Sequence, residues 1–343
     1  MTVDAPTPAV VSPDDPLRRF RRVDVQTADG LTVAAFDSGP VMTGPDAPDG
    51  GDEGPTFFLV NGLGGNLATW CHLIGRFAPR HRIATWDYRG LFASRFDAAT
   101  QARHQRGDVA LGMQAHRDDA LRVLDRLGIE RAVFFGWSMG VLVNWDLYRA
   151  IPERVLGMVQ ICGAASKVLH TTALGQVGQR IALPSMDLWR RISGVAAPWV
   201  ARAMGSSRAI EIAAALGAVA PSIDINVARA IAAEYVKLDF DVYNRILAGL
   251  AQADASDLLP RVARPVLVVA GDRDVFTPAP LSEAMARSIP GAELLVMKGG
   301  SHYLPIEFPA LLNETVASFV ARRVAPGGSG TGGVAAHGRV STS

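Results

Sequence analysis

Five short segments of this chain are apolar at nearly every position, and they constrain its fold more than any other feature. They are Thr56–Val60, Arg82–Trp86, Ala132–Phe135, Val155–Ile161 and Val266–Ala270. A strand with one face in water alternates apolar and polar residues, whereas a continuous apolar run of this length fits a strand buried on both faces. Such strands occur in parallel sheets that helices cover on both sides. The segments therefore predict an α/β fold around a parallel sheet.

The stretches around these segments support the same fold and add strands of the opposite direction. Val109–Leu127 carries apolar residues at helical spacing and is followed by Gly128, a typical residue just beyond a helix end. Near the N-terminus, Arg22–Thr27 and Leu31–Asp37 read as two strands joined by the turn signal Ala28-Asp29-Gly30. A hairpin that leads into alternating strands and helices predicts a mostly parallel, mixed sheet with helices on both faces.

The chain of 343 residues is expected to form one folded body with unstructured tails. Three stretches are rich in Pro or Gly and poor in large apolar residues, so they cannot offset the entropy of ordering. These are the N-terminal tail 1–17, the internal segment Gly39–Pro55 and the C-terminal tail 326–343. The predicted α/β core comprises residues 18–162 and 256–325.

Residues 163–255 interrupt the alternation, because they contain helical patterns and no strand-like run. The patterns lie near Gln176–Ile181, Met186–Met204, Arg208–Val219, Asn226–Lys237 and Val242–Ala253. Strand and helix alternate again after Pro265. An all-helical insertion between two strands of a sheet is expected to form a cap, or lid, over one edge of that sheet.

Composition excludes several classes of protein. Lys plus Arg number 34 and Asp plus Glu 33, so the net charge of +1 provides no broad field for nucleic acid or an acidic membrane surface. No run approaches the roughly 20 apolar residues of a membrane span, and the N-terminus lacks the apolar core of a signal peptide. We therefore expect a cytoplasmic protein. Its two cysteines, Cys71 and Cys162, have no metal-ligand spacing and are interpreted as buried free thiols.

The strongest chemical signal is the sequence Gly136-Trp137-Ser138-Met139-Gly140, which follows a predicted strand and precedes a helical pattern at Val141–Arg149. A G-x-S-x-G motif in this context forms a tight turn that raises the serine hydroxyl above the sheet. The glycines allow neighbouring backbone to approach closely. The next backbone N–H points into the site at a helix N-terminus, where developing negative charge is favoured.

A serine needs a general base that a carboxylate orients, and candidates for both follow later strands. Gly271-Asp272-Arg273-Asp274 comes directly after one apolar run, and His302 lies in Gly299-Gly300-Ser301-His302-Tyr303 after the run Leu294–Met297. The carboxyl ends of parallel strands meet at one edge of a sheet, where catalytic groups gather.

With these motifs in this order, residues 20–323 resemble the α/β-hydrolase family. The resemblance implies that Ser138 is the nucleophile, Asp274 the orienting acid and His302 the base. Asp274 rather than Asp272 matches the family pattern G-x-x-D-x-x-x-P, which ends here at Pro278. Asp272 is expected to cap the loop. The alternative acid position, in the loop Cys162–Ser166, holds no carboxylate.

The resemblance also implies an oxyanion hole, and here the chain departs from the family pattern. The loop Asn61–Asn66 is similar to the family's His-Gly-x-Gly-Gly, so the backbone N–H groups of Leu63 and Met139 are the implied donors. Asn61 replaces the histidine and is expected to brace the loop. In the segment Asp87–Ser94, Phe92 replaces a family glycine and is expected to narrow the pocket, while Asp87 and Arg89 are interpreted as structural.

These residues favour acyl transfer to water, and we expect a carboxylic-ester hydrolase acting on a moderately apolar small-molecule ester. A serine at the turn argues against relatives that use an aspartate nucleophile. Perhydrolysis, C–C bond hydrolysis, lactone or thioester hydrolysis and acyl transfer remain open, as does a ligand-sensing protein without catalysis. No cofactor or metal is implied, and the oligomeric state stays open. The other six histidines are interpreted as surface or helix-face residues, since none forms a metal-like pair.

Overall fold

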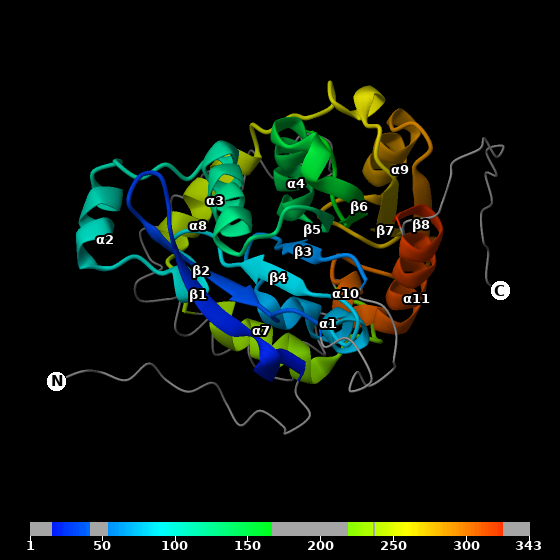
Figure 1. Cartoon of the computed structure of the whole chain (residues 1–343), viewed down its shortest axis with the longest axis horizontal. Coiled ribbons are helices and arrows are strands. Elements are labelled where there is room, and N and C mark those ends of the chain that lie inside the picture. Colours follow the sequence, from blue (N-terminus) through cyan, green and yellow to red (C-terminus); the bar gives the residue numbers. More distant parts are fainter. Residues whose placement is uncertain (1–15, 42–53, 167–218, 236, 325–343) are drawn as a thin grey trace.

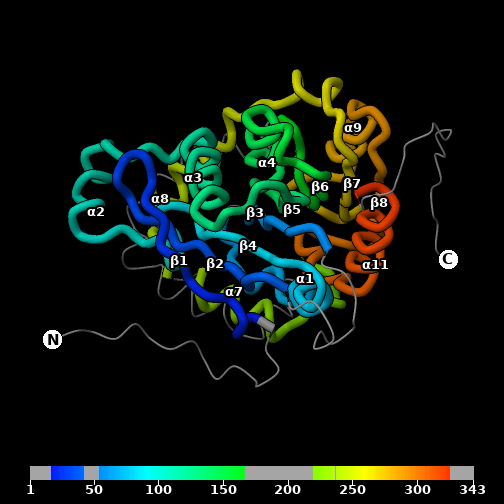
Figure 2. Tube along the Cα trace, viewed as in Figure 1, coloured from blue at the N-terminus to red at the C-terminus, as the bar shows by residue number. Residues whose placement is uncertain are grey.

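An eight-stranded sheet forms the centre of the protein in the computed structural model, which describes residues 16–41, 54–166, 219–235 and 237–324. The strands are β1 (Arg21–Gln26), β2 (Thr32–Asp37), β3 (Phe57–Val60), β4 (Ile83–Trp86), β5 (Ala132–Trp137), β6 (Val155–Ile161), β7 (Val266–Gly271) and β8 (Glu293–Met297). Their order across the sheet is β1-β2-β4-β3-β5-β6-β7-β8, which can be followed in Figure 2.

The sheet is mostly parallel, as predicted. β1 pairs antiparallel with β2 and β2 antiparallel with β4, whereas every later pair is parallel. The turn between β1 and β2 contains Gly30 at a φ of 79°, a conformation that glycine adopts without strain. The predicted hairpin and the five predicted buried strands are all present, with ends that differ by at most a few residues.

Helices cover both faces of the sheet (Figure 1). Their bounds are α1 (Cys71–Phe77), α2 (Ala98–Gln105), α3 (Met113–Arg126), α4 (Met139–Ala150), α7 (Ile225–Tyr235), α8 (Phe240–Leu250), α9 (Ala279–Ser288), α10 (Leu304–Glu307) and α11 (Pro309–Phe319). Helix α3 starts four residues later than predicted and ends before Gly128, which has a φ of 62°.

The alternation of side chains along the central strands explains the two layers of helices. Phe58 and Phe134 point to the face where α3, α4 and α9 pack. Phe57 and Phe135 point to the opposite face, against α1 and α11. All four rings are 1% exposed or less. Because each strand is buried on both sides, it has no position for a polar side chain in contact with water.

The predicted tails and insertion are only partly within the described residues. The tail 326–343 lies outside them, as do residues 1–15, and the predicted N-terminal tail ends earlier than expected because a 3₁₀ helix begins at Pro16. Of the five helical patterns in 163–255, Asn226–Lys237 corresponds to α7 and Val242–Ala253 to α8. The other three fall almost entirely on residues 167–218, outside the described part. No helix among the described residues is long and apolar enough to cross a membrane.

Candidate active site

Ser138 lies at the sharp turn between β5 and α4, at the centre of the sheet's carboxyl edge. Its φ of 55° and ψ of −118° lie outside the regions that non-glycine residues normally occupy. The turn needs both glycines. A Cβ on Gly140 would lie 2.1 Å from the carbonyl oxygen of Val60, and a Cβ on Gly136 would lie 2.8 Å from the carbonyl oxygen of Gly140. The strained turn and its glycines therefore match the motif mechanics predicted above.

The three residues predicted to form the triad lie together, although they come from separate loops. The Nε2 atom of His302 is 2.8 Å from the Oγ atom of Ser138. The Nδ1 atom of His302 is 2.8 Å from the Oδ2 atom of Asp274. The ring therefore bridges the hydroxyl and the carboxylate, with Nδ1–H assigned as donor to Asp274 and Nε2 as acceptor from Ser138. The indole N–H of Trp137 donates to the His302 carbonyl oxygen at 2.8 Å and fixes the histidine backbone.

Asp274 is held as a buried carboxylate. Its Oδ1 atom accepts hydrogen bonds from the backbone N–H groups of Phe276 and Thr277, both at 2.8 Å. Its Oδ2 atom also accepts from the Thr277 hydroxyl at 2.7 Å. Burial alone would raise the pKa of Asp274, but the bonds from His302 and Thr277 outweigh it and hold that pKa below its ordinary value. The carboxylate therefore stays charged at neutral pH beside the imidazole.

Asp272 has the capping role expected of it. Its Oδ1 atom accepts from the backbone N–H of Gly299 at 2.7 Å, which connects the loop after β7 to the loop that carries His302.

The loop after β3 lies against Ser138. A Cβ on Gly62 would be 3.1 Å from the Ser138 Cβ and 2.7 Å from the Trp137 ring. Met139 is the first residue of α4, so its N–H cannot have an acceptor within the helix. Within the described residues, no acceptor is found for the Leu63 N–H either. The two amides implied as oxyanion donors are thus both free to bind a ligand.

Asn61 braces this loop, as expected from its position. Its Nδ2 atom donates to the Trp86 carbonyl at 2.8 Å, and its Oδ1 atom accepts from the Trp70 indole at 2.7 Å. Its backbone carbonyl accepts from the Tyr88 hydroxyl at 2.6 Å. The side chain is 1% exposed, so asparagine fills the histidine position of the family pattern with its hydrogen bonds satisfied.

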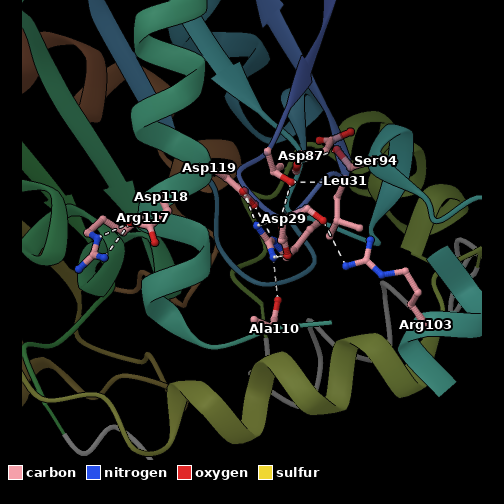
Figure 3. Close-up of polar contacts among 11 residues, drawn as sticks. Asp29, Leu31, Asp87, Ser94, Arg103, Ala110, Arg117, Asp118 and Asp119 are labelled. Carbon is pink, nitrogen blue, oxygen red and sulfur yellow. Dashed lines mark hydrogen bonds and ion pairs between the residues drawn. The ribbon is translucent and has the colours of Figure 1, made fainter. Parts of the chain in front are cut away.

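Arg89 is structural, as predicted, and its partners lie far apart in sequence (Figure 3). The buried guanidinium forms an ion pair with Asp119 on α3. It forms a second ion pair, at 2.9 Å, with Asp29 in the β1–β2 turn. It also donates to the Ala110 carbonyl at 2.9 Å. Asp87, in contrast, forms no ion pair with any residue that the structure describes. One of its carboxyl oxygens accepts from the Ala93 N–H at 3.0 Å, and the other is buried without a hydrogen-bond partner.

Phe92, at the position of a family glycine, adopts a backbone conformation that favours glycine. Its φ is 46°, in the left-handed region, and its side chain is 6% exposed within the core cluster that includes Tyr88 and Leu91. The predicted narrowing of the pocket stays a prediction.

Some residues around the site gave no sequence signal. Glu307 is 2% exposed, and its carboxylate accepts from the backbone N–H and the hydroxyl of Ser301, next to His302, and from the Ala220 N–H at 2.8 Å. The Phe276 ring is 53% exposed and lies 5.1 Å from the His302 ring. Nothing in the motifs distinguishes Glu307 or Phe276 from ordinary residues.

One cysteine prediction needs correction. Cys71 is half-buried rather than buried, whereas Cys162 is fully buried. His104 and His116 lie on helices, in agreement with the prediction of surface or helix-face positions, and their side chains are buried. Burial, with a contribution from the charge of Arg89, lowers the pKa of His116 to about 3. His170 and His337 lie outside the described residues.

One group of metal-ligating atoms occurs among the described residues, and it overlaps the triad. Atoms of Cys162, Asp274 and His302 all lie within 4.8 Å of one another. Both ring nitrogens of His302 are already hydrogen-bonded, one to Ser138 and one to Asp274. This arrangement suits proton transfer from the serine hydroxyl.

Known proteins share the fold of this chain. Residues 55–309 match the family described as alpha/beta hydrolase fold. A protein of Agrobacterium fabrum named "Putative carbamate hydrolase RutD" is 28% identical over 268 residues, covering 78% of this chain and 94% of that protein. A thermophilic esterase from Thermogutta terrifontis superposes with a TM-score of 0.66 at 20% identity, over 89% of this chain and 100% of that one. An enol-lactonase from Burkholderia xenovorans superposes with a TM-score of 0.63 at 19% identity. The match covers 87% of this chain and 100% of the lactonase chain.

The matched region includes β3 to β8, the three predicted triad residues and the two implied oxyanion donors. The two solved structures share the fold over 89% and 87% of this chain. The sheet order, the strained serine turn and the matched sequence lead to the same result: the chain belongs to the alpha/beta hydrolase fold family.

Proposed function

We propose that the protein is a serine hydrolase that cleaves a carboxylic ester through an acyl-enzyme. The observation that carries this proposal is the continuous hydrogen-bonded row from Ser138 through His302 to Asp274, with both contacts at 2.8 Å. A serine hydroxyl is a weak nucleophile until a base takes its proton, and a base is held in place here.

In the acylation step, the Ser138 oxygen attacks the ester carbonyl carbon while its proton passes to Nε2 of His302. The carbonyl oxygen becomes an oxyanion, which the N–H groups of Leu63 and Met139 stabilise. The charged Asp274 stabilises the imidazolium that forms. The bond to the alcohol oxygen then breaks, and the leaving alcohol takes the proton from Nε2. The serine is left as an ester of the acyl group.

In the deacylation step, water replaces the alcohol. His302 takes a proton from the water, whose oxygen attacks the acyl carbon, and the same two amides hold the second oxyanion. Collapse of this intermediate releases the carboxylic acid and returns the proton to Ser138. The cycle needs no electron transfer.

Residues 163–255 are proposed to act as the cap over this site. Two observations support this role: Tyr235 of α7 and Tyr243 of α8 both lie against Gly64 in the loop over the nucleophile. Apolar side chains of α8, including Val242 and Ile246, are buried in the main core. A cap of this kind excludes water and offers apolar contacts to an acyl group.

A carbamate is the second candidate substrate class. The relative at 28% identity carries that activity in its name and is matched over 94% of its length. The proposed chemistry would be the same up to the acyl-enzyme, because a carbamate also presents a carbonyl to the serine. Parallel assays on a p-nitrophenyl alkanoate and a p-nitrophenyl carbamate separate the two classes.

Substitution and covalent labelling of Ser138 test the proposal. Ser138→Ala is expected to lower kcat for p-nitrophenyl butyrate by at least a thousandfold, because loss of one triad member removes several orders of magnitude in rate. Ser288→Ala, whose hydroxyl only bonds the Ala284 carbonyl on the outside of α9, serves as the matched control. A fluorophosphonate should label Ser138, identified by peptide mass. More than a few per cent of activity in Ser138→Ala, or a label elsewhere, would refute the mechanism.

A further inference from the structure

Two tyrosines from the proposed cap helices pack against each other next to the loop over the nucleophile. Tyr235 is at the end of α7 and Tyr243 is in the first turn of α8. Their rings are 5.6 Å apart and nearly perpendicular, at 75°. Both side chains are only half-buried, so the pair is not sealed inside the core.

The pair lies close to the reacting groups. A Cβ on Gly64 would be 2.5 Å from Cε2 of Tyr235 and 3.4 Å from Cε2 of Tyr243. Cε2 is the ring carbon next to the one that bears the hydroxyl, so the hydroxyl ends of both rings lie against the backbone beside Leu63.

The two phenols have at least one O–H donor that they cannot use between them. Each phenol carries one O–H, and a bond between the two hydroxyls would use only one of these donors. Burial raises the pKa of Tyr243 above its ordinary value and that of Tyr235 further still, so both phenols stay protonated at neutral pH.

From this placement we infer a specificity element: the Tyr235–Tyr243 pair donates a hydrogen bond to an acceptor atom of the substrate near the scissile carbonyl. The inference rests on the proposed serine hydrolase function and narrows its substrate class. The preferred substrates are acyl compounds with an ether, carbonyl or carbamoyl oxygen close to the reacting carbon. Unsubstituted alkyl esters lack that atom and leave the phenol unpaired.

The test compares two nearly isosteric esters, p-nitrophenyl methoxyacetate and p-nitrophenyl butyrate, which differ by an oxygen in place of one CH₂ group. A second pair, with 2-methoxyethyl and butyl alcohol parts, tests the leaving-group side. The measured quantity is the ratio of kcat/KM for the ether ester to that for the alkyl ester. Comparing this ratio between variants cancels the intrinsic reactivity of each ester.

Tyr243→Phe and Tyr235→Phe keep the packed rings and remove one hydroxyl each. For one of the two ester pairs, each is expected to lower the ratio three- to tenfold, the effect of about one hydrogen bond. The double variant should lower the ratio at least as far as the more damaging single variant. Tyr148→Phe is the matched control, since its hydroxyl accepts from the Ala263 N–H near the far end of α4. Its ratios should equal those of the wild type.

The outcomes separate this inference from the function it rests on. The tyrosine proposal is overturned if both single variants leave the ratios unchanged for both ester pairs. If Ser138→Ala is at the same time inactive on all esters, the proposed serine hydrolase function still stands. Activity of Ser138→Ala, or no hydrolysis of any ester by the wild type, would instead refute the hydrolase itself. If one variant fails to fold, as thermal unfolding would show, the other decides the result.

Discussion

At the scale of single residues, the two carboxylates of the loop after β7 have different partners. Asp274 bonds His302 and three donors of its own loop, whereas Asp272 bonds the Gly299 backbone. The first contact decides which nitrogen of the imidazole carries the proton, and the second only connects two loops. The same chemical group is therefore expected to matter for rate in one position and for stability in the other.

Substitution by asparagine should separate these roles. Asp274→Asn is expected to lower kcat by about three to four orders of magnitude with little change in KM, because the amide favours the wrong histidine tautomer. Asp272→Asn should change kcat less than tenfold. Steady-state kinetics of both variants, with thermal unfolding as the fold control, provide the comparison. A larger loss in Asp272→Asn would reverse the assignment.

Asp87 should make stability depend on pH. Burial, with a smaller contribution from Glu234, raises the pKa of Asp87 to about 7, against an ordinary value of 3.8. A carboxyl group whose pKa is higher in the folded protein than in the unfolded chain stabilises the fold most at a pH below its unfolded pKa. This stabilisation is lost as the pH rises through the folded pKa. Wild-type stability should therefore fall by roughly 1.4 kcal/mol per pH unit relative to an uncharged variant between about pH 4 and pH 7.

Asp87→Asn removes the charge and keeps an oxygen for the Ala93 N–H. The free energies of unfolding of variant and wild type, measured in urea at four pH values, should agree near pH 4 and diverge towards pH 8, with the variant more stable. Asp108→Asn, at an exposed site, controls for the loss of one charge. A constant difference across the range would contradict the prediction.

At the scale of elements, α7 and α8 connect the proposed cap to the core. The side chain of His72 on α1 lies 3.1 Å from that of Asp224, the residue before α7. The side chain of His104 on α2 lies 2.9 Å from that of Asp241 on α8. Gln101 of α2 adds a bond to Asp239 at 3.0 Å. These contacts hold the two helices over the edge of the sheet where Ser138 lies.

A cap with apolar side chains towards the site should affect chain-length preference. Each buried CH₂ contributes about 0.8 kcal/mol, so each added carbon should raise kcat/KM by up to roughly fourfold while the pocket still has room. We expect kcat/KM for p-nitrophenyl esters to rise from acetate towards medium chains and then fall. The series from two to sixteen carbons provides the measurement. A steady decline from acetate would indicate a small closed pocket.

At the scale of the whole molecule, Arg89 connects parts of the sheet that are distant in sequence. Its guanidinium joins the β1–β2 turn at Asp29 to α3 at Asp119, and both Arg89 and Asp119 are 3% exposed or less. A buried ion pair contributes little in total, but removal of one partner leaves an unpaired buried charge.

Arg89→Met should therefore lower the free energy of unfolding by about 3 to 5 kcal/mol. Arg106→Met, which removes an exposed ion pair with Asp108, should cost no more than about 1 kcal/mol. Urea unfolding at neutral pH compares the two. Adding Asp119→Asn to Arg89→Met should recover part of the loss, and equal effects of the two arginine substitutions would argue against the network.

Sequence reasoning succeeded where local physics determines the outcome. A run such as Val266–Ala270 has no polar position, so only a strand buried on both faces accommodates it, and the serine turn requires its glycines. Helix α2 was not predicted, because Ala98–Gln105 has no apolar period. The partnership of Arg89 with Asp119, 30 residues away, depends on tertiary packing that no local pattern encodes.

The same limit explains what was missed around the site. Tyr235 and Tyr243 read as core residues of a helical insertion, and their pairing depends on how α7 meets α8. Glu307 reads as an ordinary acidic residue, although it binds the loop of His302.

The distance along the chain between the proposed nucleophile and the proposed base has a consequence for biosynthesis. Ser138 and His302 are separated by 164 positions, and at 5 to 20 residues per second a ribosome needs about 10 to 30 s to add them. During that interval the growing polypeptide contains Ser138 without His302. Under the proposed mechanism the hydroxyl then has no base, so the unfinished chain is not expected to attack cellular esters. On the same proposal, reactivity begins only when β7 and β8 join the sheet.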